Sequence, residues 1–149
     1  MPSMAARSFL VALLSVFILA AVALAGGKDD IMAGNRAAQA GQFKKAEALY
    51  SKAIASKDLT PANLAVAYNN RGSARDDLGR TKAALADYAQ ALAIDPAYAE
   101  VYYNRSYTYE KLKQWDKALA DGAKAAELQP NDDTYLQREH YLRSKAKGK

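Results

Sequence analysis

A repeat of 34 residues constrains this chain of 149 residues more than any other feature of its sequence. When the sequence is shifted against itself by 34 positions, identical residues coincide: Tyr68 with Tyr102, Asn70 with Asn104, Arg71 with Arg105, Ala84 with Ala118, Ala91 with Ala125 and Pro96 with Pro130. A shift of 38 positions superposes Gly34 on Gly72, Gly41 on Gly79 and Tyr50 on Tyr88. Self-similarity at a spacing of about 20 to 50 residues is typical of stacked structural units. The sequence therefore predicts three units, with four extra residues between the first and the second.

Within each unit, apolar residues recur at the spacing of an α-helix. In the second unit Leu85, Tyr88 and Leu92 lie three or four positions apart, which places them on one face of a helix. Breaks in the pattern divide each unit into two antiparallel helices, and they fall at Gly41, Gly79, Pro96 and Pro130. Four residues make about one helical turn, so we expect the extra residues to lengthen a helix that begins after Thr60 and Pro61. The pattern predicts an all-α fold.

Two stretches of this pattern resemble the tetratricopeptide repeat: AYNNRGSARDDLGRTKAALADYAQALAIDP and VYYNRSYTYEKLKQWDKALADGAKAAELQP. The resemblance extends over three repeats, at residues 27–60, 65–98 and 99–132. It implies an α-solenoid, in which helix pairs form a right-handed superhelix and the first helix of each pair lines a concave groove. The third repeat departs from the family pattern with Ser106, Lys113 and Gly122, where the pattern has glycine, glycine and tyrosine.

Residues 133–149 predict a capping helix followed by a basic tail. A repeat buries its apolar face only against a neighbour, so the last repeat needs a cover. Asp132 or Asp133 is suited to cap the N-terminus of this seventh helix. We expect the face that contacts the third repeat to carry Tyr135, Leu136, Tyr141 and Leu142.

The family resemblance implies which side chains face the groove: Asn35, Asn69, Asn70, Ser73, Asp77, Tyr103, Asn104, Tyr107 and Lys111. Amides can hydrogen-bond the backbone of an extended peptide, and tyrosines offer amphipathic contact area beside them. The alternative is that Asn70 and Asn104 only bond to a neighbouring helix. A clamp for a C-terminal carboxylate is not expected, because Ile31, Glu100 and Asn104 stand where chaperone-tail-binding members of the family have basic residues.

Arginine and aspartate recur together sixteen positions apart, as Arg71 with Asp87 and Arg105 with Asp121. The first repeat has an alanine and a leucine at the matching positions, so both charges are absent there together. We therefore hypothesise an ion pair between the two helices of the second repeat and another in the third. The alternative is that these charges are solvated independently. Removing one partner of a half-buried pair is costly even where the pair itself stabilises little.

The first 25 residues differ in kind from the repeats. Arg7 precedes an uncharged apolar run at residues 8–25, which ends in Ala-Leu-Ala before Gly26. A basic start, an apolar core and a small-residue cleavage site are the parts of a secretory signal peptide. We therefore expect residues 1–25 to be removed and the remainder to be exported, as a periplasmic or secreted bacterial protein. The alternative is an uncleaved inner-membrane anchor, because the run reaches the lower limit of roughly 17 residues that can span a bilayer.

The composition argues against catalysis. The chain has no cysteine and one histidine, His140, so its sequence offers no thiolate, no nucleophile–base arrangement and no evident metal site. The sequence also shows no glycine-rich loop of the kind that holds phosphates. We therefore expect no enzymatic activity, no metal and no cofactor.

Charge is distributed unevenly along the chain. Residues 26–137 hold equal numbers of basic and acidic side chains, whereas the last seven residues read RSKAKGK. A neutral body does not favour nucleic acid, and the basic tail is suited to weak contact with an anionic membrane surface. The sequence predicts a non-enzymatic scaffold that binds a protein or peptide partner in a bacterial envelope assembly. The alternative is a self-associating homo-oligomer whose groove is filled by another copy or by its own tail.

Overall fold

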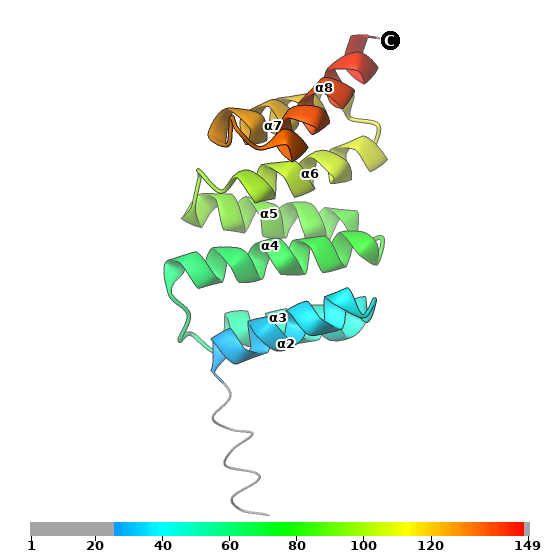
Figure 1. The fold of residues 1–149 in the computed structure, drawn as a ribbon. Coiled ribbons are helices and arrows are strands. Elements are labelled where there is room, and N and C mark those ends of the chain that lie inside the picture. The colour runs from blue at the N-terminus through cyan, green and yellow to red at the C-terminus, as the bar shows by residue number, and fades with distance from the viewer. Residues whose placement is uncertain (1–25, 148–149) are drawn as a thin grey trace, which may run out of the picture.

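The computed structural model describes residues 26–147, and these residues form seven α-helices and no strand. The helices are α2 (Gly27–Gln39), α3 (Phe43–Ala55), α4 (Pro61–Asp77), α5 (Thr81–Ile94), α6 (Ala99–Lys111), α7 (Trp115–Leu128) and α8 (Asp133–Lys147). Successive helices pack in antiparallel pairs that stack one above another, as Figure 1 shows. This arrangement confirms the all-α solenoid of helix pairs that the repeats predict. The expected leader at residues 1–25 lies outside the described residues.

The stack has two layers and two edges. The helices α2, α4 and α6 contact one another in turn and form the inner layer, which α8 continues, while α3, α5 and α7 form the outer layer. The turns α2–α3, α4–α5 and α6–α7 lie on the right in Figure 1, together with the end of α8. We call this side the turn edge. The loops that join one pair to the next lie on the opposite edge.

The helix α4 is one turn longer than its counterparts, with 17 residues against 13 in α2 and 13 in α6. The added turn accommodates the four extra residues between the first and second units. Thr60 caps this helix, because its side chain accepts a hydrogen bond from the backbone N–H of Asn63 at 3.3 Å. Pro61 takes the first helical position, where the N–H that proline lacks would have no intrahelical partner.

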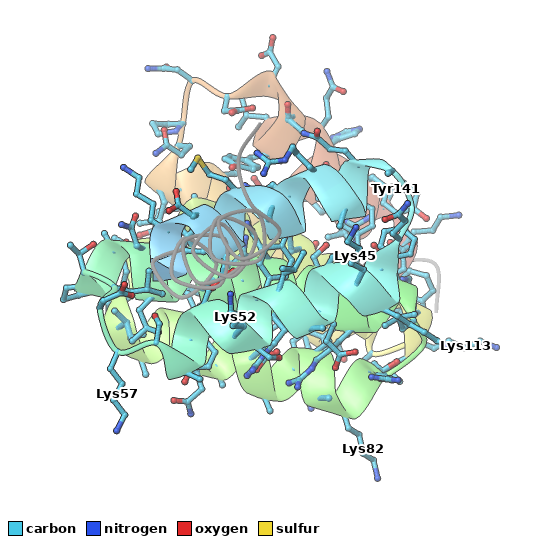
Figure 2. The ribbon with its side chains drawn as sticks, turned by 90° about the horizontal axis from the view of Figure 1, so that it is seen from below. Lys45, Lys52, Lys57, Lys82, Lys113 and Tyr141 are labelled. Atoms are coloured by element: carbon cyan, nitrogen blue, oxygen red, sulfur yellow. The ribbon has the colours of Figure 1, made fainter. Side chains whose placement is uncertain are left out.

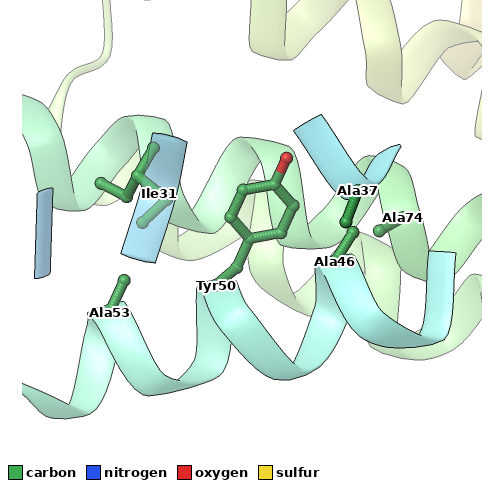
Figure 3. Close-up of a cluster of buried hydrophobic side chains, with 7 residues drawn as sticks. Ile31, Ala37, Ala46, Tyr50, Ala53 and Ala74 are labelled. Carbon is green, nitrogen blue, oxygen red and sulfur yellow. The ribbon is translucent and has the colours of Figure 1, made fainter. Parts of the chain in front are cut away.

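Tyrosine rings lie on glycines in the first two helix pairs. Tyr50 of α3 and Tyr88 of α5 are almost fully buried. A Cβ atom on Gly34 would stand 2.5 Å from the Tyr50 ring, and a Cβ atom on Gly72 would stand 2.8 Å from the Tyr88 ring. Glycine therefore lets each pair of helices approach closely around a buried ring. Alanines and Ile31 complete the core around Tyr50 (Figure 3).

The third pair replaces this contact with the capping helix. Its matching positions hold Ser106 and Gly122 in place of the glycine and the tyrosine. Leu142 of α8 is fully buried and lies over Gly122, where a Cβ atom would stand 2.8 Å from Leu142 Cδ1. Arg138 of α8 donates a hydrogen bond from Nε to Ser106 Oγ at 2.9 Å. Ser106 and Gly122, two of the residues at which the third repeat departs from the family pattern, therefore form the surface on which α8 packs.

The buried face of α8 differs from the expected one. Leu142 is buried, but Leu136 is 41% exposed and Tyr141 is 39% exposed. Arg138, which is only 6% exposed, belongs to the buried face instead. Leu136 and Leu142 are six positions apart, and a helix turns by about 100° per residue, so the two leucines point in different directions. The Asp132 side chain caps α8 by accepting a backbone hydrogen bond at 2.8 Å.

Two features are absent from the described part of the chain. No helix within residues 26–147 combines the length and apolar character that crossing a membrane requires. Within the same residues, no three histidine, aspartate or glutamate side chains gather as the ligands of a metal ion would.

Candidate binding groove

Three adjoining hollows run along the inner layer, and neighbouring hollows share residues. The hollow between α2 and α4 shares Ser73 and Asp77 with the hollow between α4 and α6. The second hollow shares Tyr107 with a third, between α6 and α8. Together they form one groove that crosses the whole layer. Eight of the predicted side chains line it: Asn35, Asn70, Ser73, Asp77, Tyr103, Asn104, Tyr107 and Lys111.

A ladder of amides joins α2, α4 and α6 along the groove. Asn35 Oδ1 accepts hydrogen bonds from Tyr50 Oη at 2.8 Å and from Asn70 Nδ2 at 2.9 Å. Asn69 Oδ1 accepts a hydrogen bond from Asn104 Nδ2 at 3.1 Å. Asn69 Nδ2 donates to Asn70 Oδ1 at 3.3 Å, which connects the two halves. Each inner helix is thus bonded to the next through side-chain amides.

Asn69 does not line the groove, contrary to the sequence prediction. Its side chain is fully buried and donates a further hydrogen bond to Glu100 Oε1 at 3.3 Å. Adjacent residues of a helix point about 100° apart, so Asn70 reaches the groove while Asn69 turns into the interior. Asn70 and Asn104 line the groove and also bond to neighbouring helices, so the bonds named in the alternative interpretation are present together with the groove-lining position. Among the described residues, Asn35 Nδ2 and Asn104 Oδ1 have no partner and remain open to a ligand.

An arginine between tyrosines forms the end of the groove at α8. The Arg138 guanidinium lies over the Tyr107 ring, 3.5 Å from the ring centroid, and its Nη1 lies 2.6 Å from Glu110 Oε2. The Tyr103 and Tyr107 rings meet edge to face, with 3.1 Å between their hydroxyl oxygens. Burial, with the neighbouring Tyr107 hydroxyl, raises the pKa of Tyr103 to about 12, so this phenol is neutral at ordinary pH. Tyr107 itself is 40% exposed and presents an aromatic surface to the groove.

The sequence analysis did not identify Arg138, Glu110 and Tyr141 as groove residues. All three line the hollow between α6 and α8. The signal was present, because Arg138 lies four positions before Leu142 and so shares a helical face with it. The charge of Arg138 argued against burial, and only its bonds to Ser106 and Glu110 make burial tolerable.

Acidic side chains stand in the middle of the groove. Asp76 is buried, and Lys111 Nζ lies 2.7 Å from its Oδ2. Asp77 lies at the surface, and desolvation by its surroundings raises the pKa of its carboxyl group; Lys111 opposes this shift and Asp76 adds to it. Glu100 is exposed on α6, but it lines a separate hollow with Tyr98 and Tyr135 and accepts a hydrogen bond from Asn69. A basic group of a ligand in the groove would therefore find a favourable carboxylate at Asp77.

The arginine and aspartate of the second and third repeats lie in direct contact. Arg71 donates from Nε and Nη2 to the two carboxylate oxygens of Asp87, at 2.9 and 2.8 Å. Arg105 makes the same two-pronged contact with Asp121, at 2.7 and 2.8 Å. Both aspartates are buried, whereas the arginines are half-buried. The contacts join the two helices of each repeat and lie away from the groove.

The pair in the second repeat belongs to a larger network that the sequence analysis missed. Arg75 Nη1 also donates to Asp87, at 2.8 Å, and Arg75 Nε donates to Glu47 of the first repeat at 2.9 Å. Burial opposes ionisation of Glu47, but the hydrogen bond from Arg75 and the charges of Arg75 and Arg80 outweigh it and lower the pKa of Glu47. Arg71 and Arg75 are one turn apart on α4, so both reach the same carboxylate. The network ties the first repeat to the second.

The attachment of α8 to α6 should weaken in acid. Burial opposes ionisation of Glu110, but hydrogen bonds from Tyr141 and Arg138 and the charge of Arg138 outweigh it and hold the pKa of Glu110 below its usual value. A carboxyl group whose pKa is lowered by folding stabilises the folded state above its unfolded pKa. That stabilisation is lost as the pH falls through the folded value.

Thermal unfolding of Glu110→Gln and the unsubstituted protein at pH 7 and pH 3 tests this coupling. The variant is expected to melt at a lower temperature at pH 7, and the difference between the two proteins should shrink at pH 3, because the stabilisation is lost as the pH falls through the lowered pKa of Glu110. Because other carboxylates titrate in both proteins, only the difference between them reports on Glu110. A difference that is the same at both pH values would contradict the prediction.

A family model described as TPR repeat matches residues 72–113, and one described as tetratricopeptide repeat matches residues 99–132. The chain is 32% identical over 104 residues to DnaJ homolog subfamily C member 7 of Homo sapiens, and the match covers 68% of this chain and 20% of that protein. It is 31% identical over 100 residues to Sperm-associated antigen 1 of Mus musculus, where the match covers 67% and 10%. The matched part thus spans a fifth or less of these two proteins.

Solved structures share the stacked helix pairs. The TPR domain of Arabidopsis OM64 superposes with a TM-score of 0.70 at 29% identity, covering 79% of this chain and 94% of that one. The myosin chaperone UNC-45 from C. elegans, crystallised in complex with a Hsp90 peptide, superposes with a TM-score of 0.73 at 26% identity, covering 85% and 14%. Helix pairs of this kind with a groove along one layer define a helical-repeat interaction module. The chain belongs to the tetratricopeptide repeat family.

Proposed function

We propose that this protein is a scaffold that binds an extended segment of a partner protein along the groove. The observation that carries the proposal is the continuity of the groove across α2, α4, α6 and α8, with open amide atoms at its centre and exposed tyrosines at one end. A backbone carbonyl of an extended segment can accept a hydrogen bond from Asn35 Nδ2, and a backbone N–H can donate one to Asn104 Oδ1. Each such hydrogen bond contributes about 0.5–1.5 kcal/mol.

The side chains of the groove favour a particular kind of segment. The tyrosine surface at Tyr103 and Tyr107 suits an apolar or aromatic side chain. The carboxylate of Asp77 suits a basic one. We therefore expect an internal segment that carries a basic residue followed or preceded by an apolar one.

A C-terminal carboxylate is a poor ligand for this groove, although the UNC-45 structure contains a Hsp90 peptide. Ile31 is buried at 6% exposure and Glu100 is acidic, at positions where carboxylate-binding members of the family have basic residues. Asn104 is neutral and already donates to Asn69. The cations among the groove-lining residues are both paired, Lys111 with Asp76 and Arg138 with Glu110. The groove therefore lacks a cluster of free positive charge to hold a terminal carboxylate.

The setting that we propose is a bacterial envelope assembly, reached by export. This rests on the sequence of residues 1–25, whose apolar run and Ala-Leu-Ala ending suit signal peptidase. Mass spectrometry of the exported protein is expected to find a chain that begins at Gly26. A membrane-bound product that retains Met1 would contradict this and would favour the anchored alternative.

Site-specific photo-crosslinking in the producing cell tests the proposed groove. A benzophenone amino acid at Ser73, which lines two of the hollows, is expected to crosslink one partner segment. The matched control carries the same group at Ala86, which is exposed on α5 of the outer layer, and should not. Equal yields from the two positions would contradict the proposal. A crosslink from Ser73 to a second copy of this chain would favour the self-associating alternative.

A further inference from the structure

Lysines gather on the turn edge of the stack. Figure 2 looks along the stack and shows Lys45, Lys82 and Lys113 toward the right, with Lys57 on the left. The side chains on the turn edge, Lys45, Lys82 and Lys113, are exposed and have no ion-pair partner among the described residues. Other basic residues of the same edge lie in the first turns of α3 and α7 and near the end of α8: Lys44, Lys117, Arg143 and Lys145. The opposite edge also carries lysines, among them Lys57, but acidic residues are more numerous there: Asp58, Asp95, Glu127, Asp132 and Asp133.

Local stability does not account for these lysines. The first turn of a helix favours acidic side chains, yet α3 and α5 have none there and carry Lys45 and Lys82 instead. Lys113 has a φ of 57°, in the left-handed region that favours glycine. The first two repeats have Gly41 and Gly79 at the matching position, with φ of 70° and 74°. Positive charge is therefore placed on this edge against local backbone and helix-dipole preferences, as is common at functional surfaces.

Apolar side chains stand between the lysines. Leu112, at the turn after α6, is 41% exposed. Phe43 and Leu78 are half-buried and line a shallow, mostly apolar hollow together with Lys45. Phosphates of a nucleic acid would match the charge of this edge but not its apolar side chains. A bilayer with anionic headgroups matches both, because lysines are attracted to the headgroups while apolar side chains enter the acyl boundary.

We propose that the turn edge docks on an anionic phospholipid surface, with Lys45, Lys82 and Lys113 at the headgroup phosphates and Leu112 at the acyl boundary. The groove runs along the inner layer and shares Phe43 alone with the hollow at the turn edge, so a docked protein can still hold its partner.

Vesicle flotation of the exported protein, purified after removal of the leader, tests this docking. The protein is expected to float with vesicles that contain phosphatidylglycerol and not with pure phosphatidylcholine vesicles. Binding should disappear at about 1 M salt, where the Debye length is about 3 Å. Each neutralised lysine is expected to weaken partitioning by about fivefold. The triple variant Lys45→Gln, Lys82→Gln, Lys113→Gly should therefore lose about a hundredfold.

A second triple variant serves as the matched control. Lys28→Gln, Lys57→Gly and Lys124→Gln remove the same charge from the opposite half of the stack, and Lys57 shares the left-handed conformation of Lys113. This control is expected to bind anionic vesicles nearly as well as the unsubstituted protein. The single variant Lys113→Gly separates charge from stability, because it should weaken binding while the melting temperature holds or rises.

Three results would overturn the docking proposal. The first is an equal loss of binding to anionic vesicles in the two triple variants. The second is equal binding to neutral and anionic vesicles. The third is binding to a 20-base-pair DNA duplex without binding to vesicles. The crosslink from Ser73 to a partner is expected to persist in the variant Lys45→Gln, Lys82→Gln, Lys113→Gly. Failure of the docking proposal and failure of the proposed groove function are therefore distinguishable.

Discussion

Replacing Asp87 with alanine is expected to lower the free energy of unfolding by about 3 kcal/mol, at the lower end of the range for breaking a buried ion pair. Asp87 is 3% exposed and accepts three hydrogen bonds, two from Arg71 and one from Arg75. Its removal leaves the Arg71 guanidinium half-buried with only Ser51 Oγ at 3.2 Å to accept from it. Urea unfolding followed by circular dichroism measures the loss.

A double variant distinguishes the ion pair from a general effect of the substitution. Asp87→Ala combined with Arg71→Leu removes the uncompensated charge, while Arg75 keeps Glu47 as a partner. We expect this double variant to be more stable than Asp87→Ala alone. Asp116→Ala, at an exposed position of α7, is the control and should change stability by less than about 0.5 kcal/mol. Equal stability of the single and double variants would show that the pair does not couple the helices.

Replacing Leu142 with alanine is expected to cost about 3 kcal/mol of unfolding free energy. Leu142 is fully buried over Gly122, and its loss leaves a cavity where α8 covers the third repeat. Leucine and alanine have similar helix propensities, so the loss reports on packing and not on helix formation. Hydrogen exchange should locate the destabilisation in α7 and α8.

Leu136→Ala is the matched control for Leu142→Ala, because it makes the same substitution in the same helix at a position that is 41% exposed. Its effect is expected to stay within about 0.5 kcal/mol. If the two variants lose the same stability, α8 is not seated on the third repeat as described. If Leu142→Ala alone is destabilised, the loss of stability arises from the packing of α8 on Ser106 and Gly122.

The sequence was sufficient to predict the helix pairs because each depends on local signals. Gly41 and Gly79 end helices through positive φ, and the shift from 34 to 38 residues corresponds to one added turn of α4. The pairing of Arg71 with Asp87 also predicted a contact, because the two charges are present together in the second and third repeats and absent together in the first. Each of these signals lies within one repeat or in the spacing between repeats, so it can be recognised without knowledge of the tertiary structure.

The direction of side chains at the border between the buried face and the groove face of a helix could not be predicted in the same way. Asn69 and Asn70 are adjacent amides, and a rotation of about 100° decides that one is buried and the other lines the groove. Arg138 is buried because Ser106 and Glu110 are brought to it from α6, and that proximity depends on how α8 lies. Sequence patterns predict the helices, whereas the packing between helices determines which buried polar groups find hydrogen-bond partners.

Calorimetric titration measures whether the groove recognises an extended partner segment. The segment crosslinked from Ser73, prepared as a synthetic peptide, would be titrated into the unsubstituted protein, Tyr107→Ala, Ser73→Trp and Leu112→Ala. Tyr107 and Leu112 are equally exposed, at 40% and 41%, but only Tyr107 lines the groove. We expect Tyr107→Ala and Ser73→Trp to raise Kd at least tenfold, about 1.4 kcal/mol, and Leu112→Ala to leave it unchanged. An unchanged Kd in both groove variants, with melting temperatures that show them folded, would contradict the account.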